Sequence, residues 1–163
     1  MDPEIYVMGI RNPWRISIDS KTGYLYFADP GRDDNDLDKD NIKGVDEFNQ
    51  TRKPGNFGWP FFVGHNRPYY AVSDSWEKID SLSTIKHPMN LSAHNTGLKE
   101  LPETTTPLIW YKYGLSDLFP VLGNGWRSAV GGPSYRKTDF PKASRPFPSF
   151  YEGKWFITDF IRG

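Results

Sequence analysis

The sequence contains no cysteine and only three histidines among its 163 residues. Without cysteine, the chain can form neither a disulfide framework nor a zinc site built from thiolates. Its 20 basic and 20 acidic side chains cancel, so it lacks the positive field typical of proteins that bind nucleic acid. No apolar run approaches the roughly 20 residues that a membrane-spanning helix needs. What remains is a chain long enough for one domain with a hydrophobic core.

Aromatic residues are abundant, with six Trp, nine Tyr and eleven Phe, although the mean hydropathy is only −0.65. Aromatic side chains fit pleated surfaces, so their number favours an all-β core. The alternative is that some rings face solvent and stack on sugar rings. Trp126 and Arg127, which lie in a glycine-rich segment, are the pair that we expect to be exposed.

Alternating apolar and polar residues predict short strands along the chain. Residues 14–19 alternate, residues 20–23 form a turn that ends in Gly, and residues 24–28 complete a hairpin. Further strand-like segments occur at 45–49, 107–111 and 154–159. No long segment has the 3.6-residue period of an amphipathic helix. The pattern predicts an all-β fold, with residues 1–163 as a single domain.

Residues 70–106 interrupt this pattern with a mixture of Ser, Thr, His, Asn and Pro. We interpret the segment as an irregular loop insertion, which on a rigid scaffold usually shapes a binding face. The three histidines, His65, His87 and His94, lie in turns or in this insertion and outside any motif. We assign none of them a catalytic role.

Arg11 and Asn12 precede Pro13, which restricts Asn12 to an extended conformation and holds the loop rigid. A guanidinium beside an amide suits a planar ligand rich in carboxylates. On spacing alone, the structural interpretation is favoured instead: Arg11 would pair with an acidic neighbour and Asn12 would bond the turn backbone.

A tight turn at Asp29, Gly31 and Arg32 opens an acidic segment. Turn carbonyls and carboxylates are the hard oxygen ligands that Ca²⁺ prefers. As a motif the segment departs from a helix-flanked calcium loop, because Asn41 stands where Gly is usual, and a solvated acidic loop is the simpler interpretation. The further candidate ligands are Asp36, Asp38, Asp40 and Glu47.

In order and spacing, the segments G-I-R-N-P-W-R, Y-L-Y-F-A-D-P-G and G-N-F-G-W-P resemble the soluble quinoprotein sugar dehydrogenases of the glucose/sorbosone dehydrogenase family. The similarity continues in W-Y-K-Y-G and F-Y-E-G-K-W-F-I-T-D-F near the C-terminus. Members are β-propellers of about six blades, so the resemblance implies a partial propeller of about three four-stranded blades with long irregular loops. The chain would be the C-terminal portion of the whole propeller.

The resemblance also implies a cofactor site. Arg11 and Asn12 map to residues that contact pyrroloquinoline quinone (PQQ), and the carbonyls of Gly31 and Arg32 map to those that hold Ca²⁺. In the family, the ion polarises the quinone, which takes hydride from C1 of an aldose. The general base of the family is a His on an earlier blade, and this chain has no matching segment. Ile161 stands where the family has Lys.

Two functions follow from these observations. The first is part of a calcium- and quinone-dependent aldose dehydrogenase. The second is a propeller module without catalysis, which binds a carbohydrate or acts as a scaffold, so enzymatic activity stays open. Exposed blade faces predict a homodimer or contact with N-terminal blades. Because residues 1–4 carry no export signal, we expect the chain to begin inside a longer protein located in the periplasm or outside the cell.

Overall fold

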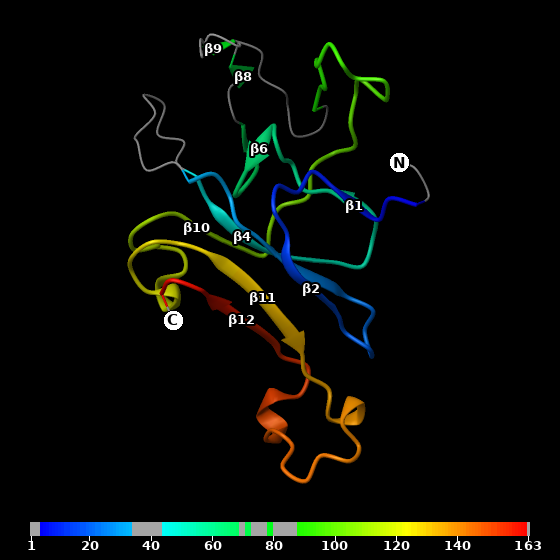
Figure 1. Cartoon of the computed structure of the whole chain (residues 1–163), viewed down its shortest axis with the longest axis vertical. Helices are drawn as coiled ribbons and strands as arrows, with labels where there is room; N and C mark the ends of the chain where they lie inside the picture. The colour runs from blue at the N-terminus through cyan, green and yellow to red at the C-terminus, as the bar shows by residue number, and fades with distance from the viewer. Residues whose placement is uncertain (1–3, 34–43, 69–70, 73–77, 80–87, 163) are drawn as a thin grey trace.

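The computed structural model describes residues 4–33, 44–68, 71–72, 78–79 and 88–162 (Figure 1). Within these residues the regular structure consists of twelve short strands and three single-turn 3-10 helices. The strands assemble into several small sheets rather than a closed barrel. The predicted all-β, partial-propeller class is therefore confirmed.

The largest sheet has four antiparallel strands in the order β10-β4-β3-β2. They are β2 (Trp14–Ile18), β3 (Leu25–Asp29), β4 (Asp46–Thr51) and β10 (Ile109–Tyr111). The predicted hairpin is confirmed, because β2 and β3 pair antiparallel. Its turn is stabilised by the Asp19 carboxylate, which accepts the backbone N–H groups of Lys21 and Thr22, both at 2.9 Å, as in an Asx turn.

A second hairpin, formed by β11 (Ala129–Ser134) and β12 (Trp155–Asp159), lies beside β2 and β3 (Figure 1). Gly131 permits this approach, because a Cβ there would lie 2.9 Å from the carbonyl oxygen of Arg15. Between the hairpin strands, the chain extends away from the sheets and carries η2 (Lys137–Asp139) and η3 (Ser149–Tyr151) (Figure 1). A four-stranded sheet followed by the first two strands of another is the arrangement of successive propeller blades.

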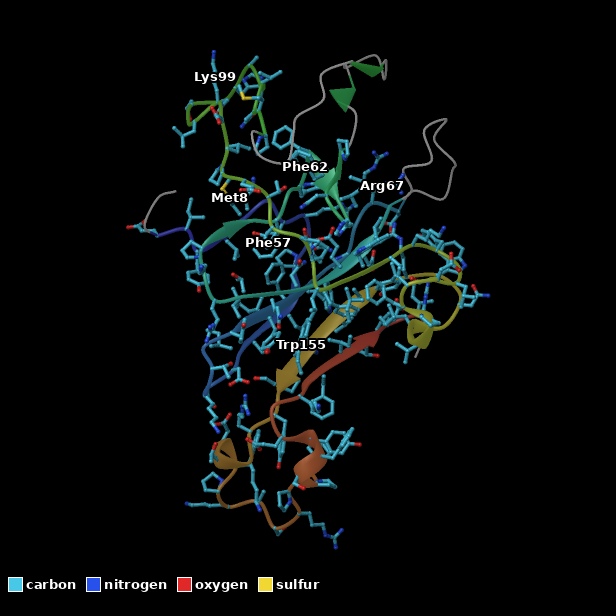
Figure 2. All side chains as sticks on the ribbon, turned by 180° about the vertical axis from the view of Figure 1, so that it is seen from behind. Met8, Phe57, Phe62, Arg67, Lys99 and Trp155 are labelled. Atoms are coloured by element: carbon cyan, nitrogen blue, oxygen red, sulfur yellow. The ribbon has the colours of Figure 1, made fainter. Side chains whose placement is uncertain are left out.

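The main core lies between these two sheets. Its buried members are Ala28, Phe48, Tyr111 and Ala129, each at most 1% exposed. Trp155 of β12 closes the cluster with its ring centroid 5.8 Å from that of Phe48 (Figure 2). The small side chains of Ala28 and Ala129 allow the sheets to approach, while burial of each large side chain contributes about 1.5–3 kcal/mol.

A second cluster packs on the other face of β3. Phe57 meets Phe27 edge to face with 4.9 Å between ring centroids, and Phe62 is buried nearby (Figure 2). The strands of this region are β1 (Val7–Met8), which pairs parallel with β5 (Gly55–Asn56), and β6 (Phe62–Val63), which pairs with β7 (Arg67–Pro68). The corner at residues 56–60 is structural, since the Asn56 side chain accepts the N–H of Gly58 at 3.0 Å.

The described residues contain fewer propeller blades than the sequence predicts. About three blades are expected, whereas these residues form one four-stranded sheet and one adjoining hairpin. In the predicted insertion, the structure places a short pair, β8 (Ala71–Val72) with β9 (Lys78–Ile79), and an isolated bridge between Met89 and Glu100. None of the helices that the structure describes is long or apolar enough to span a membrane.

Candidate functional site

A cavity of about 340 Å³ opens where the loop before β2, the end of β3 and the loop before β11 meet. Arg11, Asn12 and Gly31, three residues singled out from the sequence, all lie on its wall. Its lining consists of Arg11, Asn12, Trp14, Pro30, Gly31, Asp33, Asp46, Arg127, Ser128, Val130 and Phe160. The structure thus brings together residues from both ends of the chain.

Asp29 fixes the loop that carries Arg11 and Asn12. Its carboxylate accepts the backbone N–H of Arg11 at 2.9 Å and that of Asn12 at 2.7 Å. Burial raises the pKa of Asp29, while these two N–H groups oppose that shift by stabilising the ionised form. Asp29, expected from the sequence as a metal-ligand candidate, acts here as the acceptor that orders this loop.

The side chains of Arg11 and Asn12 stay exposed on the cavity wall. The Arg11 guanidinium donates to the carbonyl oxygen of Pro30 at 3.3 Å and lies 5.8 Å from the Trp59 ring centroid. Among the described residues, no carboxylate forms a salt bridge with it. The acidic partner expected in the structural interpretation of Arg11 is absent from this part of the chain, which leaves the guanidinium available to an anion.

A buried ion pair forms the floor of the cavity. The Arg127 guanidinium pairs with Asp46 and also donates to the carbonyl oxygen of Arg32. Asp46 further accepts the N–H of Gly31 at 3.0 Å and that of Ala129 at 2.7 Å. Burial raises the pKa of Asp46, and the Arg127 charge and these N–H groups counteract the shift. The pair therefore joins the end of β3, the start of β4 and the start of β11.

Glu47 lies next to this pair but faces the opposite side of β4, because successive residues of a strand point to opposite faces. It is 7% exposed and accepts the N–H of Gly64 at 2.6 Å. Burial raises its pKa to about 8, with the neighbouring Asp29 charge adding to the shift. It stands directly opposite Asp29 in the sheet. Glu47 is absent from the residues that line the cavity.

Of the expected calcium ligands, the Arg32 carbonyl is already engaged, because it accepts from the Arg127 guanidinium. Among the residues described, no cluster of three or more His, Asp or Glu side chains could hold a metal. The candidates Asp36, Asp38 and Asp40 lie outside the described residues.

Trp126 and Arg127 were expected to be exposed together, but one lies at the surface and the other is buried. Trp126 is 60% exposed and packs edge to face on Tyr113 at 5.4 Å, away from the cavity lining. Arg127 is only 4% exposed, so the prediction of exposure is wrong for it. Its charge is neutralised by Asp46, a partner 81 residues away, which local sequence could not indicate.

Sequence reasoning missed several wall residues: Trp14, Asp33, Asp46, Ser128 and Phe160. The available signal was proximity, since Trp14 is two residues after Asn12 and Asp33 directly follows Arg32. Of the histidines, His65 and His94 are exposed and absent from the cavity wall, and His87 lies outside the described residues.

Comparison with known proteins agrees with the resemblance noted from the motifs. Residues 1–96 match the glucose / sorbosone dehydrogenase family. The chain is also similar to the HIPL1 protein of Arabidopsis thaliana, 30% identical over 146 residues that make up 82% of this chain and 19% of that protein. It is 33% identical over 90 residues to the HIPL2 protein of the same plant, covering 53% of this chain and 11% of that protein.

The chain thus spans less than a fifth of the length of these curated relatives, since 19% of the one and 11% of the other are covered. No solved structure gives a significant match. The family match covers residues 1–96, which include the Arg11–Asn12 loop, β3 and the buried carboxylates of β4. On this evidence the chain belongs to the glucose / sorbosone dehydrogenase family.

Proposed function

We propose that this chain supplies the anion-binding part of a quinone site in a sugar dehydrogenase of this family. One observation carries the proposal: Arg11 and Asn12 lie on a single cavity wall, on a loop held by Asp29, and no carboxylate in the described residues pairs with the guanidinium. PQQ is a flat ring system bearing carboxylates, which suits a guanidinium beside an amide. When bound, such a quinone accepts hydride from a sugar.

Within this proposal, Arg11 would hold a carboxylate and Asn12 would bond a neighbouring oxygen. Asp33, which also lines the cavity, opposes a bound anion through its negative charge. Calcium has no place in the proposal as the site stands, because the Arg32 carbonyl is engaged by Arg127. Quinone affinity is therefore expected to be the same with added Ca²⁺ and with a chelator.

Titration calorimetry with PQQ tests the proposal. Wild type should bind, and Arg11→Ala should weaken binding roughly tenfold or more, because a charge-assisted bidentate contact is lost. Arg145→Ala is the matched control, since Arg145 is exposed and belongs to a different cavity. Equal affinity in wild type and Arg11→Ala would contradict the assignment, as would the absence of binding.

A second candidate is a propeller that binds carbohydrate or acts as a scaffold without catalysis. The engaged Arg32 carbonyl favours it, together with the exposure of His65 and His94 away from the cavity. Titration calorimetry with PQQ and with an aldose separates the two. PQQ binding supports the quinone site, whereas aldose binding without PQQ binding supports the binding module.

Two expectations about the surroundings of the chain become proposals here. We propose that Ile16 and Ile18 of β2, which are 67% and 68% exposed, are covered either by a second copy or by preceding blades. Sedimentation of wild type and an Ile16→Lys/Ile18→Lys variant would show whether a dimer forms through this strand. We also propose that the whole protein works in the periplasm or outside the cell, which fractionation of the native host would test.

A further inference from the structure

Two large apolar rings, Trp14 and Phe160, lie on the cavity wall and remain exposed. Trp14 is 52% exposed and Phe160 is 82% exposed. The fold gains little from burying these rings. Exposed aromatic side chains beside convergent polar groups are characteristic of ligand-binding surfaces.

The backbone at Phe160 is held in place by several hydrogen bonds. Its N–H donates to the carbonyl oxygen of Ser128 at 2.8 Å. The Asp159 carboxylate then accepts the N–H groups of Ile161 at 2.8 Å and Arg162 at 2.9 Å. The Arg162 guanidinium donates to a ring of backbone carbonyls, those of Lys112, Gly114, Leu122, Gly123 and Gly125. The turn is thus ordered before any ligand binds, which lowers the entropy cost of binding.

Trp14 shares a rigid segment with the anion-binding pair. It begins β2 opposite Ala28, just before a β-bulge at Arg15, whose φ is 63°. On the other side, Gly131 of β11 packs close to the Trp14 carbonyl oxygen, which a Cβ on the glycine would approach to 3.5 Å. Because the Asn12 backbone is held by Asp29, the backbone that carries Arg11, Asn12 and Trp14 is held at both ends.

We infer that Trp14 and Phe160 provide stacking faces for the flat ring system of the anion that Arg11 and Asn12 bind. The inference rests on the proposed function and predicts that the site prefers planar ligands to non-planar ones. Aromatic faces favour flat π systems, and a guanidinium that has no carboxylate partner among the described residues favours carboxylates. A neutral pyranose has no charge for Arg11 to contact, whereas an aromatic polycarboxylate satisfies both features.

The test compares a planar with a non-planar polycarboxylate. Dissociation constants for PQQ and for citrate are measured with wild type, Trp14→Ala, Phe160→Ala and Arg11→Ala. Each ring variant should weaken PQQ binding by roughly two- to tenfold and leave citrate binding unchanged. Arg11→Ala should weaken both. Matched controls are Trp126→Ala and Phe150→Ala, whose rings are 60% and 73% exposed and lie outside this cavity. Circular dichroism verifies that all variants fold.

The outcomes separate the two claims. If Arg11→Ala weakens PQQ binding and the ring variants do not, the stacking role is wrong while the proposed function stands. An equal loss for PQQ and citrate in the ring variants also overturns stacking, because planarity is then not selected. If wild type binds neither compound, the proposed function fails and this inference fails with it.

Discussion

The carboxylate of Asp29 accepts the backbone N–H of Asn12 at 2.7 Å, across 17 residues of sequence. The last residue of β3 thereby determines the path of the loop that leads into β2. Both side chains of the Arg11–Asn12 pair are left pointing to solvent and cavity, since the backbone and not the guanidinium satisfies Asp29. The carboxylate positions this loop without forming an ion pair with the Arg11 guanidinium.

Replacing Asp29 should loosen this loop. Asp29→Ala leaves two partly buried N–H groups without an acceptor, so we expect a loss of about 1–3 kcal/mol of unfolding free energy. Hydrogen exchange at the amides of Arg11 and Asn12 should accelerate more than exchange in β11. Asp117→Ala, at an exposed position, is the control and should change neither quantity. Unchanged exchange at both amides in the Asp29 variant would contradict the positioning role.

Removing the buried Arg127 side chain should strongly destabilise the fold. Arg127→Ala leaves Asp46 buried and unpaired and frees the Arg32 carbonyl, so we expect a loss of about 3–5 kcal/mol. Urea denaturation measures it, with exposed Lys142→Ala as the control. A double variant, Asp46→Asn with Arg127→Leu, should recover part of the loss because no charge then stays unpaired.

Burial of Glu47 should make the free energy of unfolding decrease as the pH rises. The folded pKa is about 8, against 4.5 for the unconstrained group, so the folded state binds the extra proton between these values. The contribution of Glu47 to the free energy of unfolding is complete below about pH 4.5, and it is lost as the pH rises to about 8. Glu47→Gln should flatten the dependence between pH 5 and 8. Urea denaturation at both values compares the variant with wild type, and parallel slopes would contradict the burial of a protonated carboxyl.

Replacing Asp33 should increase the affinity of the cavity for anions. Asp33→Asn removes a negative charge from the wall, so PQQ should bind roughly two- to fivefold more tightly at low salt, with a smaller gain at high salt. Asp139→Asn, at an exposed site outside this cavity, is the control. Calorimetry at two salt concentrations supplies the measurement. Weaker binding of the variant would indicate that Asp33 contacts the ligand directly.

Local patterns in the sequence predicted the β-hairpin at residues 14–28 and the rigidity around Arg11 and Asn12. These features depend on neighbours within a few residues: alternation, turn residues and the restriction imposed by Pro13. Local patterns did not indicate the partner of the Arg32 carbonyl, which was expected to bind calcium. That carbonyl accepts from Arg127, a residue far along the chain.

By itself, the sequence determined the all-β class and singled out the Arg11–Asn12 loop, since strand period and the Arg-Asn-Pro motif are short-range properties. Only the tertiary structure decided which residues join that loop. The pairing of Asp46 with Arg127 across 81 residues, and the position of Phe160 on the same wall as Trp14, arise when β11 and β12 pack beside β2 and β3. That packing depends on close backbone approach at Gly131 and on the shared core, which no local pattern encodes.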